Sequence, residues 1–389
     1  MLTHPPTYAK IRVKPNIKSE VTTVSNFGIN VFDFGAKGDG ITDDTAAIQA
    51  AINYTAERGG GKILFPYTKG GYRIASPAIE EYEGKPLRAQ LMIPPGAANI
   101  MLEGEMPPRI LNAYLVIKPE WLELGRKPTR FVKYTGVPLG ANNVRIFSDW
   151  EAPEERDGTK RPYSIIAAPE GDMFRGKFST WKFNMKNLDF RVPMNTDKMY
   201  PTQGGANLQN ISRVHLTDCQ FALAENIGDT ILGKELQPNP THCAGLVLSG
   251  DQNDNNILRN VCAQGFRYGI VAGENVVAES LTLLNCEEAL TFHDCSHLST
   301  INHIVAQHNT VIISTTDIDL FGMPKGPCNV RIGTVNFEPG IGHEPKISAL
   351  KYGVKDTDGR LHGELKYHAA WGDPEFPTIC TDSFKAERF

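Results

Sequence analysis

The stretch VFDFGAKGDGITDDTAAIQAAI, residues 31–52, decides the fold because an apolar start and an Asp/Gly-rich turn lead into a helical pattern. Thr42 or Asp43 can accept hydrogen bonds from the first free amides of that helix. Small and apolar residues then follow the spacing of one buried helical face, namely Ala47, Ile48, Ala51, Ile52 and Thr55. RGGG at 58–61 ends the helix, and KILFP and GGYRIAS follow as strand-like runs. The sequence predicts a strand, a turn, a helix at about 44–57 and further strands.

Two functional interpretations of this stretch are weaker. A phosphate loop needs GxxxxGK[ST] or GxGxxG between a strand and a helix, and GAKGDG fits neither pattern. A metal site made by Asp39, Asp43 and Asp44 is disfavoured because helix capping already explains two of the three acids.

The motif INVFDFGAKGDGITDDTAAIQAAI…GGGKILFP…YRIA resembles the opening segment of the pectate-lyase-3-like family, within the polygalacturonase-like group. The match is dense over residues 29–76 and weaker over 91–105. The resemblance implies a right-handed parallel β-helix. It implies much less about the reaction, since such families include polysaccharide hydrolases, lyases, epimerases and phage tailspike depolymerases.

Internal periodicity supports a solenoid. The apolar centres Ile270, Leu290 and Val311 recur at steps of 20 and 21 residues, with Leu246 a further 24 residues upstream. Asparagines occupy the turns, as left-handed bends favour. Units of this size cannot bury an apolar face alone, whereas stacked coils can. We therefore predict an all-β, right-handed parallel β-helix whose helix covers the open edge of the first coil.

The expected organisation has three parts: an N-terminal arm (1–28), one β-helix domain (29–340) with loop-rich insertions at about 77–180, and a non-repeating cap or subunit contact (341–389). Four cysteines, Cys219, Cys243, Cys262 and Cys286, are spaced by 24, 19 and 24 residues, which predicts equivalent inward positions. No CxxC pair occurs, so neither a disulfide scaffold nor a zinc ribbon is indicated.

Composition restricts the partners. Forty basic and 44 acidic residues give a net charge of −4, which argues against a general nucleic-acid or anionic-membrane binder. No apolar run approaches the roughly 20 residues of a membrane-spanning helix. The first residues, MLTHPPTYAKIRVKP, lack the apolar core of a secretory signal, so we expect a cytoplasmic or phage-borne protein, or one whose leader was removed.

Acidic residues end successive apolar runs, at Asp251, Glu274, Asp294 and Asp317. In stacked coils they would form a ladder with neighbours roughly 5 Å apart and alternate acids roughly 10 Å apart. Such pairs suit glycoside hydrolysis, where one acid protonates the leaving oxygen and the other attacks or activates water. They could also bind Ca²⁺ in a lyase. For any single aspartate, turn formation is the simpler explanation.

His293 is predicted to face outward beside Asp294, between the small neighbours Gly273 and Ser314, and to act as acid or base. An ordinary surface histidine is the alternative. Further acids, Asp229, Asp254 and Glu225, are weaker candidates. Arg267 and Tyr268 are candidates for contacting an acidic sugar and stacking on its ring. His297, His303 and His308 match no zinc spacing.

The NTD of polygalacturonases occurs in MNTDKMY (194–200), but the DD pair, GHG and RIK do not follow, so that family's site is not transferred. We expect a polysaccharide-processing enzyme, first a glycoside hydrolase needing no cofactor. The alternatives are a Ca²⁺-dependent lyase with Arg267 as proton acceptor, and a non-catalytic glycan-binding phage fibre or adhesin. The resemblance suggests a trimer.

Overall fold

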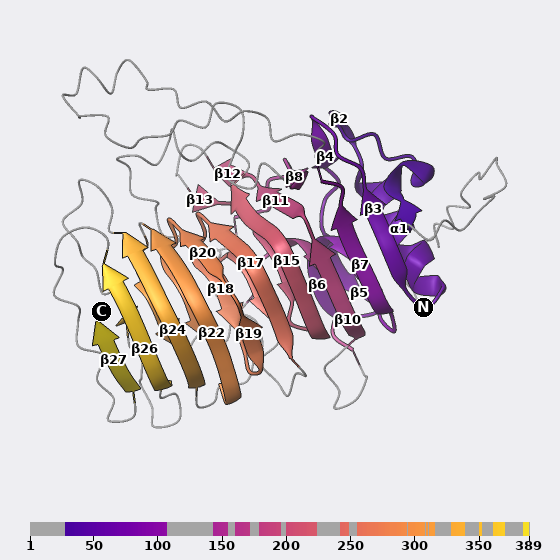
Figure 1. Ribbon diagram of the computed structural model, residues 1–389. Coiled ribbons are helices and arrows are strands. Elements are labelled where there is room, and N and C mark those ends of the chain that lie inside the picture. Colours follow the sequence, from indigo (N-terminus) through magenta and orange to yellow (C-terminus); the bar gives the residue numbers. More distant parts are fainter. Residues whose placement is uncertain are drawn as a thin grey trace, which may run out of the picture.

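The chain folds as a stack of parallel coils (Figure 1). The computed structural model describes residues 28–106, 143–154, 160–171, 179–195, 200–223, 242–248, 255–293, 295–307, 309, 311–315, 328–338, 350–351, 361–369 and 384–388. Within these residues, almost every strand pairs in parallel with the equivalent strand of the next coil, which is the arrangement of a right-handed parallel β-helix.

The larger sheet, sheet A, follows one side of the stack. Its strands in hydrogen-bonding order are β1 (Ile29–Asn30), β3 (Gly61–Phe65), β7 (Ala98–Gly104), β10 (Thr180–Lys186), β15 (Ile211–Leu223), β17 (Asn256–Gln264), β19 (Val276–Ala278), β22 (Cys295–Gln307), β24 (Cys328–Glu338), β26 (Leu361–Ala369) and β27 (Phe384–Arg388). Strands β2 (Asp39–Asp43), β4 (Gly71–Ile74), β8 (Val144–Ser148), β11 (Leu188–Val192) and β20 (Leu281–Leu284) continue it around a bend.

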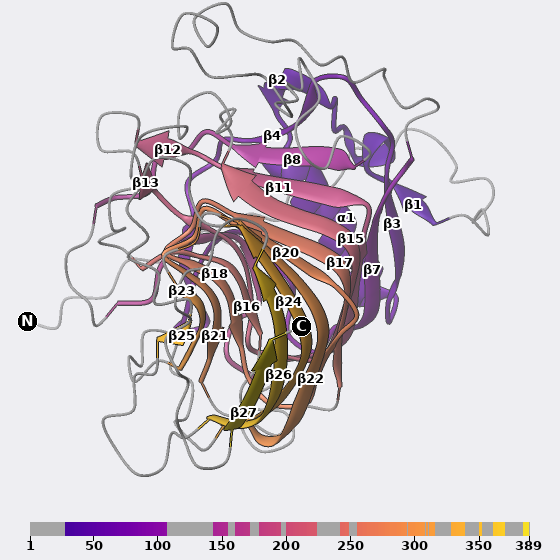
Figure 2. The ribbon, with the colours of Figure 1, turned by 60° about the vertical axis from the view of Figure 1, so that its left-hand side comes forward.

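Sheet B forms the opposite side of the coils (Figure 2). It consists of β25 (Leu350–Lys351), β23 (Val311–Thr315), β21 (Glu288–Phe292), β18 (Tyr268–Ala272), β16 (Ala244–Leu248), β14 (Gly204–Leu208), β9 (Ser164–Ala167), β6 (Lys85–Met92) and β5 (Ile79–Tyr82). Only the β5–β6 pair is antiparallel among its described pairs. Strands β12 (Met194–Asn195) and β13 (Tyr200–Pro201) pair antiparallel with each other.

Residues in the left-handed conformation mark the corners of the coils. At one corner Asn99, Lys182, Arg213, Asn255 and Asn275 have φ between 53 and 62°; we call these five residues the left-handed ladder. Asn187, Asp218 and Asn260 mark a second corner, where β15 and β17 bend. Asparagine tolerates this conformation better than most residues, so the expectation that asparagines mark the turns is confirmed.

The predicted apolar register is confirmed for three coils and wrong for the fourth. Leu246, Ile270 and Leu290 stack in the core, but the next member is Ile313, not Val311. Val311 pairs with Glu288 instead. A slip of two residues keeps every side chain on its face, so alternation alone did not distinguish the two registers.

The cysteine spacing was also misleading. Cys219, Cys243 and Cys286 are buried in the core, but Cys262 pairs with Gln220, on the other face of the sheet from Cys219. The four are free thiols.

In the predicted insertions at 77–180, strands β5 to β9 already belong to the coils. Likewise, β25, β26 and β27 extend the two sheets through the segment expected to be non-repeating.

Helix α1 (Thr45–Glu57) follows the short helix η1 (Val31–Phe34) and lies at the N-terminal end of the stack, as predicted (Figure 1). Asp43 holds its first turn: Oδ1 accepts hydrogen bonds from the amide and hydroxyl of Thr45 and from the amide of Ala75. Oδ2 accepts a bond from the Ser76 hydroxyl. Burial opposes ionisation, but these bonds outweigh it and lower the pKa of Asp43 to about 2. Among the described residues, no helix is both long and apolar enough to cross a membrane.

Candidate functional site

Four of the predicted site residues lie in the described part of the chain: Arg267, Tyr268, Glu274 and His293. The others lie outside the described residues: Asp229, Asp251, Asp254, Asp294, Asp317 and Glu225. The complete acid ladder therefore stays a prediction.

Glu274 follows strand β18, and its side chain is almost completely buried. Its Oε2 lies 2.7 Å from Nδ1 of His297 on β22, whose side chain is 63% exposed. Ser299 fixes the turn after β18 that carries Glu274. Its hydroxyl donates to the carbonyl of Gly273 and accepts from the amide of Val276, both at 3.1 Å. The result is a pair of a buried carboxyl group and an accessible imidazole ring, two groups that can act as general acid and base.

The two residues are equivalent positions of successive coils. Val277 pairs with Thr300, and the bond from Val276 to Ser299 continues this register toward Glu274 and His297. The separation of 23 residues is one coil. The same separation joins Thr291 to Ser314 and Cys286 to Asn309.

His293 lies beside this pair but is not open to solvent. Its amide donates to the carbonyl of Ala272 at 3.0 Å, and its side chain is buried at 2% exposure. Ser314, predicted as its neighbour, pairs with Thr291 instead. The predicted register with Gly273 is confirmed, since Ala272 pairs with Phe292. The predicted exposure of His293 and its predicted neighbour Ser314 are wrong, because alternation gives the direction of a side chain and not what covers it.

A second polar cluster lies at the start of β16 and β18. The Arg267 guanidinium lies 3.2 Å from Nε2 of His242 and 3.6 Å from a carboxylate oxygen of Glu287. It also lies over the ring of Tyr268, on which His242 stacks. Burial first, and then the charge of Arg267, lower the pKa of His242 to about 4. His242 is thus neutral near pH 7, with Nε2 accepting from Arg267.

This packing affects the sugar contacts predicted for Tyr268 and Arg267. The side chain of Tyr268 is only 1% exposed, so its ring face is occupied by protein groups. Arg267 donates to its neighbours and remains partly exposed.

A chain of polar groups runs between the two clusters along β21 and β23. The hydroxyl of Ser314 donates to a carboxylate oxygen of Glu288 at 2.5 Å and lies 2.9 Å from the hydroxyl of Thr291. No three potential metal ligands converge among the described residues.

The sequence reasoning missed His297 and His242 as partners of the predicted residues. The signal for His297 was present, because its separation from Glu274 equals the coil step seen between other polar partners. His242 carried no comparable signal, since its ring meets Arg267 and Tyr268 only through packing at the corner.

Comparisons with known sequences give their matches in a short N-terminal segment of this chain. Residues 28–85 match the family described as rhamnogalacturonase A/epimerase, pectate lyase-like. Alginate lyase 7 of Azotobacter vinelandii is 59% identical over 46 residues, which is 12% of this chain and 5% of that protein. Mannuronan C5-epimerase AlgE5 of the same organism is 56% identical over 46 residues, 12% of this chain and 4% of that protein. The chain thus spans a small part of the curated relatives it matches.

Among solved structures, ORF18 of Geobacillus virus E2 aligns with 92% of this chain and 60% of its own, at 14% identity and a TM-score of 0.43. The A-module of mannuronan C-5 epimerase AlgE6 from A. vinelandii aligns with 92% of this chain and 98% of its own, at 15% identity and a TM-score of 0.34. The chain is a right-handed parallel β-helix protein whose opening segment, residues 28–85, matches the family described as rhamnogalacturonase A/epimerase, pectate lyase-like.

Proposed function

We propose that this protein is a polysaccharide-processing enzyme whose reaction uses Glu274 and its partner His297. The observation that carries the proposal is the 2.7 Å contact between the buried Glu274 carboxylate and the exposed His297 ring at one corner of the coils. A buried acid held by a titratable group suits proton transfer to or from a bound sugar.

The first candidate reaction is glycoside hydrolysis. Glu274 supplies one of the two carboxyl groups that this chemistry needs, and Asp294, the acid that ends the next apolar run of the sequence, is the proposed second. His293, whose side chain is buried, directly precedes Asp294 in the sequence. Arg267 would bind an acidic group of the substrate near the other end of β18.

The second candidate is a lyase acting on uronate polysaccharides. The similarity of the opening segment to an alginate lyase and to mannuronan epimerases favours it. In such a reaction His297, rather than Arg267, is the better proton acceptor, because the Arg267 guanidinium donates to His242 and pairs with Glu287. Ca²⁺ could neutralise the uronate carboxylate.

The test is a screen of the purified chain against neutral and acidic polysaccharides, with both reducing ends and unsaturated uronate products measured. Hydrolysis gives reducing ends alone, and a lyase gives both, with loss of the unsaturated product on chelation if Ca²⁺ takes part. Glu274→Gln should lower either turnover at least about 100-fold. Glu279→Gln is the matched control, because this exposed glutamate pairs with Arg259 on the outer face of sheet A.

Full activity of Glu274→Gln would contradict the proposed site. Glycan binding without any product across the panel would favour a non-catalytic fibre or adhesin.

A further inference from the structure

Two of the five residues of the left-handed ladder, Lys182 and Arg213, are not asparagines. Trp181 pairs with Ser212 and Phe183 pairs with Val214, so Lys182 and Arg213 occupy equivalent positions in neighbouring coils. Their φ angles are 59 and 62°, although the three other coils place asparagine there. A long side chain is strained in this conformation, and such strain tends to persist where a side chain has a function.

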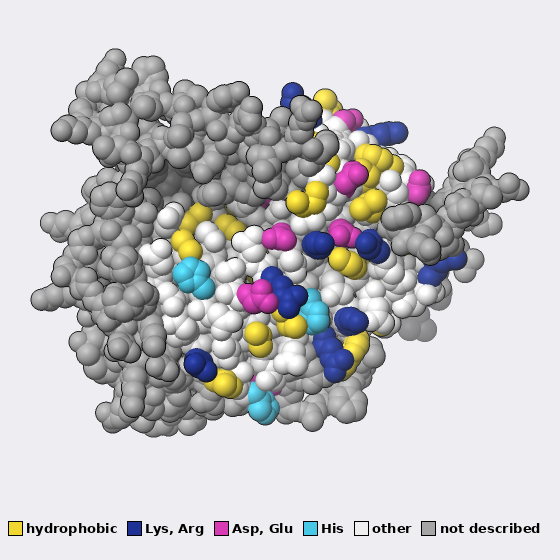
Figure 3. All heavy atoms as spheres, viewed as in Figure 1, with side chains coloured by type: hydrophobic (Ala, Val, Ile, Leu, Met, Phe, Trp, Pro, Cys, Tyr) yellow, Lys and Arg dark blue, Asp and Glu magenta, His cyan; other side chains and the backbone are white. Residues whose placement is uncertain are grey.

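The two cations are also close to each other. Equivalent residues of adjacent coils are about 4.8 Å apart at the backbone, and like charges at that spacing repel. Both side chains are exposed. Burial, and then the charges of Lys182, Arg259 and Arg213, lower the pKa of the neighbouring His215, which shows that these cations converge on one region. Figure 3 shows one group of dark-blue side chains toward the lower right of this face, with others spread above it. This positive region contrasts with the net charge of −4 of the chain.

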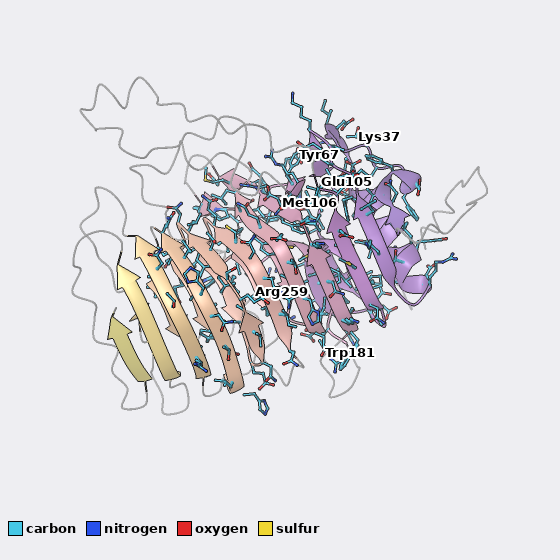
Figure 4. All side chains as sticks on the ribbon, in the orientation of Figure 1. Lys37, Tyr67, Glu105, Met106, Trp181 and Arg259 are labelled. Atoms are coloured by element: carbon cyan, nitrogen blue, oxygen red, sulfur yellow. The ribbon has the colours of Figure 1, made fainter. Side chains whose placement is uncertain are left out.

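An aromatic side chain lies with them. The Arg213 guanidinium is 4.9 Å from the ring centre of Trp181, which lies at the start of β10 (Figure 4). Trp181 is only partly buried. The guanidinium lies over one face of the indole, so a sugar with an apolar ring face and a negative group would contact the rest of the partly exposed ring and the cation together.

The ladder connects this region to the proposed site. Arg213, Asn255 and Asn275 are equivalent positions of three successive coils, because Val214 bonds to Asn256 and Asn256 pairs with Val276. Glu274 directly precedes Asn275, just as Trp181 precedes Lys182. At about 4.8 Å per coil, Arg213 lies roughly 10 Å from the level of Glu274 along the stack. Strands β10, β15, β17 and β22 begin along this same edge (Figure 1).

We propose that Trp181, Lys182 and Arg213 form a binding subsite for an acidic polysaccharide, whose chain runs along this corner to the Glu274–His297 pair. The subsite recognises uronate carboxylates by the two cations and a sugar ring by Trp181. This inference rests on the proposed function for the direction of the chain, and it names the substrate as a polyuronate rather than a neutral glycan.

The test uses the full chain carrying Lys182→Asn and Arg213→Asn together. Asparagine is the residue that the same corner carries in three other coils, so this variant is expected to fold and to melt at or above the temperature of the unchanged protein. Binding of alginate and of polygalacturonate, measured by titration calorimetry at low salt, should weaken roughly tenfold, while neutral dextran binds neither protein. Lys37→Asn with Lys69→Asn removes the same charge from exposed sites near the helix end and should leave binding unchanged.

All binding is measured in the Glu274→Gln background, so that catalysis and binding are separated. Unchanged polyuronate affinity in the double variant would overturn the subsite even if Glu274 is catalytic. Equal loss in the Lys37 and Lys69 control, or equal binding of dextran, would overturn it as well. Weakened binding in the double variant, with no turnover by the unchanged protein, would support the subsite and reject the enzyme.

Discussion

Nδ1 of His297 lies 2.7 Å from Oε2 of Glu274, although 23 residues separate them in the sequence. The contact exists because one coil of this β-helix takes 23 residues here, so the two residues occupy the same position in successive coils. The buried carboxyl group and the exposed imidazole thus form the pair that we propose exchanges a proton with a bound polysaccharide.

His297→Asn should lower kcat/KM at least about tenfold. Asparagine keeps a hydrogen-bonding group near Glu274 but cannot take up or release a proton as an imidazole does. The measurement is kcat/KM on the best polysaccharide of the screen, together with the free energy of unfolding. His303→Asn, also on β22, is the control. An unchanged kcat/KM in the His297 variant would leave the histidine a structural role only.

Stability should fall as the pH falls from 7 toward 4, partly through His242. Its pKa is about 4 in the folded chain, against about 6.5 for an unperturbed histidine. Below about pH 6.5 the unfolded chain therefore binds a proton that the folded chain does not, so folding loses stability until the pH passes the folded value. Thermal melts at pH 7 and 5 should differ less for His242→Gln than for the unchanged protein. An identical difference in both proteins would refute this contribution.

Asn187 is expected to stabilise the second corner in two ways. It is buried with φ 55°, and its side-chain amide donates to the carbonyl of Gly104 at 3.2 Å. Asn187→Ala loses the bond and places alanine in the left-handed region, so it should cost about 2–3 kcal/mol. Asn187→Gly loses only the bond and should cost about 1 kcal/mol. Urea unfolding of both variants gives the comparison, and equal losses would show that conformation contributes little.

Asp43→Ala should destabilise the N-terminal end of the stack by about 1–2 kcal/mol. The change leaves the first turn of α1 and the end of β4 without the acceptor that joins them. Asp33→Ala, at an exposed aspartate of η1, should change the free energy of unfolding by less than about 0.5 kcal/mol. The same urea experiment tests both, and a loss as large for Asp33 would mean that any acid near this end contributes equally.

Much of the fold could be predicted from local patterns. The start of α1, its glycine stop and the asparagine corners follow from capping and backbone preferences, which act within a few residues. The repeat length followed from apolar periodicity, but Val311 was chosen in place of Ile313 because both satisfy a period of two.

The candidate site was predicted less completely. Glu274 was identified as the acid at the end of an apolar run, but nothing local assigned His297 to it. His293 was placed on the correct strand end, yet its side chain is only 2% exposed, which the alternation of the strand does not predict. Tyr268 was expected to offer a ring face, which His242 and Arg267 occupy.

The sequence by itself determined that this chain stacks short strands into coils behind a covering helix, because periodicity, capping and turn preferences are local and repeat along the chain. Only the tertiary structure decided which polar side chains meet. Those partners are a full coil apart, and their contact depends on a register that backbone hydrogen bonds between coils set to the single residue.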